Sequence, residues 1–346
     1  MADQIGIEIR NLYKIFGPRA AELMEKVRAG ATKTELNEQH HHVLGLNNIN
    51  MSMAAGQIHV IMGLSGSGKS TLIRHINRLI DPTAGEVMVG GENVVGMSKE
   101  ALREFRRHQT AMVFQKFALL PNRTVLENTY YGLEIQGVPH AKRVDAAMRW
   151  IERVGLKGFE KKYPNQLSGG MQQRVGLARA LSNDAPILLM DEAYSALDPL
   201  IRVDMQTVLL DLQKEIRKTV VFITHDLDEA LRLGDSIAIL RDGEIIQQGT
   251  SQDIVLRPAD AYIENFVREV NRGRVIRADA AMAALNGAEP PAGRVSGSNT
   301  LDDAGRIMVQ NGMTRLAVID DHSGQPVGVL TMEAIMAAIT RHNAAA

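Results

Sequence analysis

The chain has 346 residues, 45% of them hydrophobic and 23% charged, which is enough for one large folded domain and a smaller one. Its 39 Lys and Arg nearly balance its 40 Asp and Glu, which excludes a global field that would draw it to nucleic acid or to a lipid surface. The absence of cysteine fits a reducing compartment. Without a signal-peptide pattern or an apolar run of about 20 residues, the chain is expected in the cytoplasm.

The first part of the chain predicts strands interrupted by a helical insert. Residues 5–12 (IGIEIRNL) alternate like a half-buried strand. Residues 17–42 then have a helical pattern in AAELMEKVRAG and TKTELNEQ, and the strand pattern returns from Val43. The histidine run at 40–42 has no carboxylate or cysteine directly beside it, so we expect solvated side chains rather than a metal site.

The middle of the chain predicts an α/β domain. The apolar strand IHVIM at 58–62 runs into the glycine loop GLSGSGKST, and STLIRHINRLI behind the loop has helical periodicity. Three further apolar strands are expected at 186–191, 219–225 and 236–240, with helical stretches between them. Strands that alternate with helices favour a largely parallel sheet.

The last part of the chain predicts a separate small unit. The loop at 287–299 is rich in glycine and proline, and TLDDAGRIMVQNG after it reads as a helix with Thr300 as N-cap and Gly312 beyond its end. RLAVID and PVGVL are expected as strands, and TMEAIMAAI as a second helix. We therefore expect a domain at 1–271, a linker or a domain remnant at 272–299, and a small α+β domain at 300–346.

The glycine loop predicts a phosphate site. It matches the pattern G-x-x-x-x-G-K-[ST] between a strand and a helix, the context in which backbone N–H groups wrap a phosphate at a helix N-terminus. Lys69 is expected to reach the β- and γ-phosphates and Ser70 to bind Mg²⁺. A turn that merely joins strand to helix is the plainer alternative, but the full match in context disfavours it. The predicted nucleotide-binding residues of the loop are Gly63, Ser65, Gly66, Ser67, Gly68, Lys69, Ser70 and Thr71.

The strand PILLMDE supplies two acids to the same site. Asp191 is expected to bind Mg²⁺, and Glu192 to act as the base that takes a proton from the attacking water. An apolar run ending in acids is often only a strand meeting solvent; together with the glycine loop it predicts a nucleoside triphosphatase.

Further motifs narrow the class. GLSGSGKST, VFQ ending at Gln115, LSGGMQQR at 167–174, LLMDEAYSALD and ITHD follow one another in this order. This set resembles the ATPase subunit of ABC transporters over about residues 5–250. The resemblance implies a P-loop ATPase fold with a RecA-like core and a helical subdomain, ATP and Mg²⁺ as cofactors, and function as a homodimer.

The resemblance also implies roles for individual residues. Ser168, Gly169 and Gly170 would cap the γ-phosphate held by the glycine loop of the other subunit, and Asp198 would cross the dimer interface. Gln115 would sense the water and Mg²⁺, and His225 would contact the γ-phosphate; with Lys69 and Glu192 they form the expected catalytic set. Phe16 matches best the aromatic that stacks on adenine, with Tyr13 as the alternative.

The surroundings of these motifs are similar to a narrower family. The insert after LYKIFG and the phrases MGLSGSGKSTLIRHINRLIDPTAGEV and FRRHQTAMVFQKFALLPNRTVLEN resemble the ATPases of bacterial uptake systems for quaternary amines, namely glycine betaine, proline betaine, choline or carnitine. The tail looks like a single CBS domain, a sensor module that normally works in pairs. Its Ala334 stands where nucleotide-binding CBS domains usually place an acid, so adenosine sensing is not expected, and a sensor of ionic strength and a packing remnant remain open alternatives.

The resemblance implies partners and a location. The chain would lie on the inner face of the plasma membrane, bound to integral permease subunits, with an external substrate-binding protein acting through the permease and no nucleic acid involved. An importer ATPase for another cargo, such as amino acids, is the main alternative. An ABC ATPase of DNA repair or translation would need a long coiled coil or a second ATPase unit, and neither is found in the sequence. A regulatory protein without turnover would not need Glu192.

Overall fold

The computed structural model describes residues 5–115, 117–195, 197–285, 287 and 289–340. The chain forms two compact units. The first runs through Asp226 and includes Leu233–Ile246, and the second comprises Leu227–Arg232 and the chain from Gln247 onward. Residues 247–271, expected in the first domain, thus belong to the second unit.

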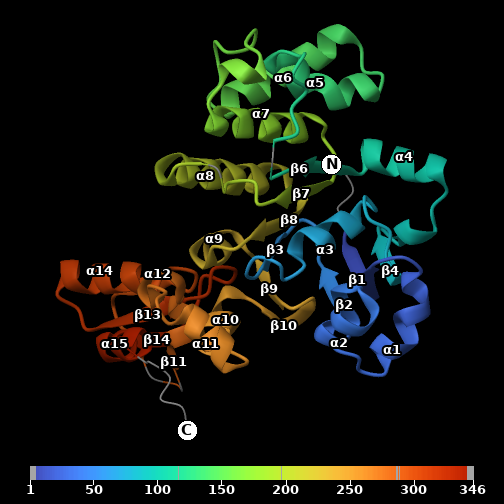
Figure 1. Cartoon of the computed structure of the whole chain (residues 1–346). Coiled ribbons are helices and arrows are strands. Elements are labelled where there is room, and N and C mark those ends of the chain that lie inside the picture. The colour runs from blue at the N-terminus through green and yellow to red at the C-terminus, as the bar shows by residue number, and fades with distance from the viewer. Residues whose placement is uncertain (1–4, 116, 196, 286, 288, 341–346) are drawn as a thin grey trace. The chain divides into compact units, whose positions relative to one another are not determined.

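The first unit is built on a six-stranded sheet with the strand order β10-β9-β3-β8-β7-β6 (Figure 1). The pairings of β3 with β8 and β9, and of β7 with β6 and β8, are all parallel, as predicted. Every residue of β3, β7 and β8 is buried, because helices cover both faces of such a sheet. The strands are β3 (Ile58–Met62), β6 (Thr110–Val113), β7 (Ile187–Asp191), β8 (Thr219–Thr224), β9 (Ser236–Arg241) and β10 (Glu244–Gly249).

A second, antiparallel sheet has the order β2-β1-β4-β5. Its strands are β1 (Ile7–Phe16), β2 (Val43–Met53), β4 (Ala84–Val89) and β5 (Glu92–Asn93). The start of β1 alternates buried and partly buried residues, and Phe16 at its end pairs with Val43 at the start of β2. This pairing closes the hairpin from which the insert projects.

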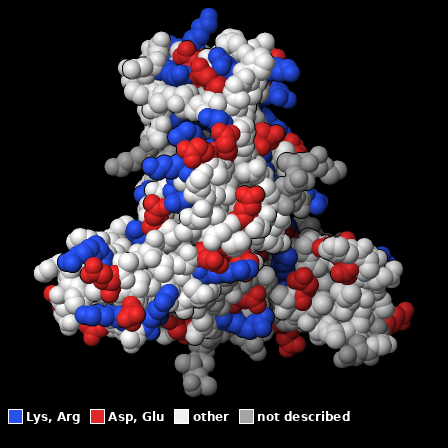
Figure 2. Space-filling view, turned by 90° about the vertical axis from the view of Figure 1, so that its right-hand side faces the viewer, with Lys and Arg blue, Asp and Glu red and all other residues white. Residues whose placement is uncertain are grey.

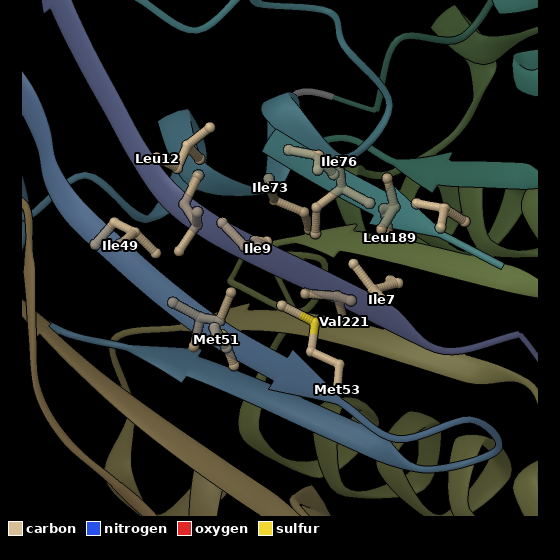
Figure 3. Close-up of a cluster of buried hydrophobic side chains, with 14 of the residues drawn as sticks. Ile7, Ile9, Leu12, Ile49, Met51, Met53, Ile73, Ile76, Leu189 and Val221 are labelled. Atoms are coloured by element: carbon tan, nitrogen blue, oxygen red, sulfur yellow. The ribbon is translucent and has the colours of Figure 1, made fainter. Parts of the chain in front are cut away.

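The main core of the first unit lies between these sheets and helix α3 (Lys69–Ile76). Figure 3 shows apolar side chains of β1, β2, α3, β7 and β8 meeting in one layer. Ile9, Ile73 and Leu189 in this cluster are at most 2% exposed. Helix α3, which follows the glycine loop, is therefore held in place by the buried apolar residues on its sheet-facing side.

Shortening a side chain in this layer is expected to destabilise the protein. Leu189→Ala should lower the free energy of unfolding by about 2–5 kcal/mol, since it leaves a cavity between closely packed strands. Leu79→Ala is the matched control, because Leu79 is 46% exposed and should change stability by no more than about 0.5 kcal/mol. Urea unfolding of both variants measures the difference, and equal effects would contradict the placement of the core.

The helical insert is confirmed within 17–42, as η1 (Ala20–Leu23), α1 (Met24–Arg28) and α2 (Lys33–His40). It has a small core of its own, formed by Leu23, Met24, Val27 and Leu36 with residues of β1 and β2. The expectation of a solvated histidine run is wrong for His42, which is 8% exposed. Its ring nitrogens contact the carbonyl oxygens of His40 (2.6 Å) and Pro18 (2.8 Å). The imidazole therefore links the start of the insert, at Pro18, to its end, at His40.

The remaining helices of the first unit follow the chain between strands β5 and β8. They are η2 (Val94–Gly96), α4 (Lys99–His108), α5 (Val125–Ile135), α6 (His140–Arg153), η3 (Pro164–Gln166), α7 (Gly169–Ser182) and α8 (Pro199–Ile216). Helices α5, α6 and α7 contact one another and form the helical group at the top of Figure 1. This group is the helical subdomain that the sequence predicts.

The second unit contains the predicted small α+β domain. Thr300 caps α14 in a capping box with Asp303, and Gly312 ends that helix in the left-handed conformation, as predicted. The expected strands and last helix are also present. The unit comprises α9 (Leu227–Leu233), α10 (Ser251–Leu256), α11 (Ala261–Val267), α12 (Arg272–Val275), α13 (Ala278–Ala281), β11 (Ala283–Ala284), β12 (Arg294–Ser296), α14 (Leu301–Asn311), β13 (Arg315–Ile319), β14 (Pro326–Thr331) and α15 (Met332–Thr340), with the sheet order β11-β14-β13-β12.

The described residues of the segment 272–299 are folded into this second unit. Ile276, Ala278 and Val295 are buried in its core, and β12 pairs with β13. The segment is therefore part of the domain rather than a free connection. Ala334 packs against the same core and donates its N–H to the Thr331 hydroxyl, so α15 begins with a threonine cap.

Charges on the face shown in Figure 2 are mixed, with Lys and Arg interspersed among Asp and Glu. Among the described helices, none has both the length and the apolar character to cross a bilayer.

Candidate nucleotide-binding site

The loop between β3 and α3 needs glycines because its backbone has positive φ values and because neighbouring strands leave no room for side chains at Gly63 and Gly68. Gly63, Gly66 and Gly68 have φ values of 154°, 80° and 106°, where residues with a side chain are strained. A Cβ on Gly63 would lie 2.2 Å from the Leu240 carbonyl oxygen, and one on Gly68 would lie 2.7 Å from that of Gly45. The loop is thus held against strands β2 and β9.

Two polar groups of this loop fit an anion. The Ser67 hydroxyl is buried and has no hydrogen-bond partner among the described residues. The Lys69 ammonium donates to the carbonyl oxygens of Gly63 (2.7 Å) and Leu64 (2.8 Å). Burial lowers the pKa of Lys69, while the nearby Glu192 and Asp191 carboxylates oppose that shift. A buried ammonium bonded to two neutral carbonyls retains its third hydrogen for a phosphate oxygen.

Asp191 ends β7 beside the first turn of α3. It is fully buried and accepts a 2.7 Å hydrogen bond from the Ser70 hydroxyl. Its second oxygen accepts from Arg74 at 3.0 Å. The sequence predicts that Ser70 and Asp191 bind one metal ion, and the structure brings their oxygens into contact. Hydroxyl and carboxylate oxygens are the ligands that Mg²⁺ prefers, so this pair fits that ion.

Glu192 follows Asp191 in the chain but is only partly buried. Its φ of 47° is unusual for a residue with a side chain, and strained backbone of this kind is common at functional sites. The Gln115 amide donates to Glu192 Oε2 at 2.7 Å, and His225 Nδ1 lies 3.9 Å from the same oxygen. Two other predicted catalytic residues, Gln115 and His225, therefore lie near the Glu192 carboxylate.

A pocket of about 310 Å³ extends from the glycine loop, Gln115 and Glu192 to the end of β1, whereas Asp191 and His225 are not among its described lining residues. Phe16 lines it, and its ring packs against Gly45, where a Cβ would lie 2.6 Å from the ring. Tyr13 is buried in the small core of the insert instead. The described residues lining the pocket are Phe16, Lys33, Val43, Leu44, Gly45, Ser65, Gly66, Gly68, Lys69, Ser70, Thr71, Gln115 and Glu192.

The LSGGM stretch and Asp198 are not among the described residues that line this pocket. Ser168 is the N-cap of α7, with its hydroxyl accepting from Met171 N, and Gly169 and Gly170 form the first turn of that helix. Asp198 caps α8 in the same way through Ile201 N. Ser168 and Asp198 are exposed, and neither they nor the two glycines line the pocket. Lys116 and Ala196, which stand beside Gln115 and within SALD, lie outside the described residues.

Arg74, Gly45 and Lys33 are among the residues of the site that were not predicted. Arg74 could have been found from its spacing, since it lies four positions after Ser70 on the same helix face. Gly45 contacts both Phe16 and the glycine loop, and Lys33 lines the pocket from the insert. No local motif marks either residue, because their positions depend on long-range strand pairing.

Comparison with known proteins identifies the family. The model of the ABC transporter family matches residues 46–195, and that of the CBS domain matches 290–341. The glycine betaine transport ATP-binding protein OpuAA of Bacillus subtilis is 54% identical over 79% of this chain and 66% of that protein. The glycine betaine/proline betaine transport system ATP-binding protein ProV of Escherichia coli is 43% identical, over 97% of this chain and 83% of that protein. The trimethylamine N-oxide transport system ATP-binding protein TmoW of Ruegeria pomeroyi is 42% identical, over 94% of each.

Solved structures agree with this assignment. The dimeric bacterial ABC transporter cassette MJ0796 is 33% identical, with a TM-score of 0.62 over 70% of this chain and 98% of that one. A post-hydrolysis structure of the same cassette, bound to ADP and phosphate, matches equally well. The chain therefore belongs to the ABC transporter ATP-binding subunits, in the family that includes these betaine and trimethylamine N-oxide transport proteins, and it carries a CBS domain.

Proposed function

We propose that this chain energises uptake of a quaternary amine, namely choline, glycine betaine or proline betaine, by hydrolysing ATP on a membrane transporter. The main support for this proposal is the pocket that is lined by the glycine loop, Lys69 and Glu192. Relatives of this chain bear the names of betaine transport systems. Uptake of another cargo, such as trimethylamine N-oxide, is the second candidate, because one relative carries that name.

Each group of the site has a role in this proposal. Mg²⁺, held by Ser70, Asp191 and Gln115, would neutralise charge on the phosphates. Phe16 stacks on adenine, the loop amides and Lys69 bind the β- and γ-phosphates, and Glu192 takes a proton from the attacking water. Gln115 orients that water, and His225 donates to the γ-phosphate.

Two copies of the chain are needed for a complete site. The exposed N-terminus of α7, with Ser168 and Gly170, does not line the pocket of its own chain. An α-helix N-terminus favours an anion, so it suits the γ-phosphate held by a partner subunit. The matching cassette that forms a dimer supports this arrangement.

The partners follow from the same proposal. The homodimer binds integral permease subunits on the inner face of the plasma membrane, and an external binding protein delivers the cargo to them. The amine then never touches this chain, which explains why its residues do not separate choline from the betaines.

The test is ATP turnover in the purified complex. The chain is co-purified with its membrane subunits, reconstituted, and assayed with its binding protein and a panel of choline, glycine betaine, proline betaine, trimethylamine N-oxide and histidine. At least one quaternary amine should stimulate turnover several-fold and histidine should not. Stimulation by histidine alone would reject the assigned cargo class.

A further inference from the structure

The insert begins and ends at the edge of the nucleotide pocket. Phe16 is the last residue of β1 before the insert, and it pairs with Val43, the first residue of β2 after the insert. Both residues line the pocket. The insert between them places Lys33 in the same lining. A segment outside the known motifs therefore contributes a cation to this site.

The backbone at Lys33 is held firmly. Thr32 caps α2 in a capping box with Glu35, with hydrogen bonds of 2.7 Å and 3.2 Å between backbone and side chains. Leu36, one turn further, is fully buried in the core of the insert. The first helical position, which Lys33 occupies, is thus fixed while its side chain remains 41% exposed.

The ammonium of Lys33 is held only weakly. It lies 3.3 Å from the Asp242 carboxylate, whose side chain is 75% exposed. Exposed ion pairs of this kind contribute little stability, because water screens them and both side chains lose freedom. An anionic ligand can therefore compete with Asp242 for Lys33.

The position along the pocket follows from the neighbours of Asp242. The next residue, Gly243, donates its N–H to the Ser67 carbonyl and packs against Gly45. Gly45 contacts both the Phe16 ring and Gly68 of the glycine loop. The ion pair with Asp242 thus places Lys33 near the segment where the strand that ends in Phe16 and the glycine loop both meet Gly45.

We propose that Lys33 leaves Asp242 when nucleotide binds and contacts the ribose and α-phosphate of the adenine nucleotide. This inference rests on the proposed function, since it takes the pocket to be the ATP site. ATP and ADP share the α-phosphate, so the contact stabilises both equally. It therefore contributes to affinity and not to the chemical step.

The test compares two lysines of the insert in the full chain. Lys33→Met removes the charge and keeps the apolar stem, and should weaken ATP and ADP binding by the same factor, about three- to tenfold. The KM for ATP should rise by a similar factor with a much smaller change in kcat. Lys26→Met is the control, because Lys26 is exposed, contacts His40 and is not among the pocket residues, so binding should stay at the wild-type value. Lys33→Arg should restore affinity, and calorimetry with each nucleotide measures all of these variants.

A substitution of Asp242 distinguishes direct contact of Lys33 with the nucleotide from a purely structural role of the Lys33–Asp242 ion pair. If Asp242 competes with nucleotide, Asp242→Asn should leave affinity unchanged or slightly higher. If the ion pair instead holds the turn behind the glycine loop, Asp242→Asn should weaken binding as much as Lys33→Met, and the inference fails. Unchanged affinity in Lys33→Met, or a loss for ATP alone, also overturns it. Absence of ATP and ADP binding in the wild type would reject the proposed function itself.

Discussion

Glu192→Gln is expected to lower ATP turnover by about 100-fold or more, because an amide cannot take the proton of the attacking water. Nucleotide affinity should change little, since binding uses the glycine loop and Lys69, and Gln is close to Glu in size. The Gln115 amide that contacts Glu192 can donate to the new side-chain carbonyl oxygen, so the local geometry should persist.

The same variant also reports on assembly. Without hydrolysis, the two ATP molecules should hold the dimer closed, and size-exclusion chromatography with ATP and Mg²⁺ should show a dimer. Ser195→Ala serves as the control, because its hydroxyl donates to the Glu192 carbonyl oxygen in the turn after β7 and not to the Glu192 carboxylate. Turnover of Glu192→Gln within about threefold of wild type would contradict its role as the base.

Lys69→Ala and Ser168→Arg should each abolish most turnover as homodimers, for different reasons. Lys69→Ala removes a buried ammonium from the phosphate loop and should weaken nucleotide binding by about 10- to 100-fold. Ser168→Arg places a bulky side chain at the N-terminus of α7, where the γ-phosphate of the partner is expected.

Mixing the two variants tests which chain the α7 N-terminus serves. If it serves the partner, one composite site in the mixed dimer carries both defects and the other carries neither, so a substantial part of the activity should return. A dimer of Lys69→Ala with wild type measures the coupling of the two sites. Activity in that control together with no rescue in the mixed dimer would mean that each site is completed within one chain.

The sequence predicts the parts of this fold that depend on local patterns. Strand β3 matches IHVIM at both ends, because a strand buried on both faces is a continuous apolar run. The capped helix α14 is also found at its predicted ends, since Thr300 and Gly312 act through neighbouring backbone groups. The glycine loop and the proximity of Ser70 and Asp191 follow from their motifs, whereas Gln115 and His225 were expected near Glu192 only from the resemblance to ABC transporter ATPases.

Features set by long-range packing could not be predicted. The imidazole of His42 is buried because it reaches back 24 residues to the Pro18 carbonyl, and a Cβ on Gly17 would lie 2.3 Å from its ring. Residues 247–271 join the second unit through burial of Val255 in its core, which composition does not reveal. Lys33 reaches the pocket only because the pairing of Phe16 with Val43 closes the insert beside it.

Uptake into proteoliposomes tests whether ATP hydrolysis by this chain drives transport of a quaternary amine. The chain is reconstituted with its membrane subunits and binding protein, with ATP and Mg²⁺ on the side that this chain faces, and labelled choline, glycine betaine and proline betaine are offered on the other side. The wild type should accumulate at least one of these amines against its gradient, and Glu192→Gln should accumulate none. Accumulation that persists with Glu192→Gln or without ATP would contradict the claim that this chain drives the transport.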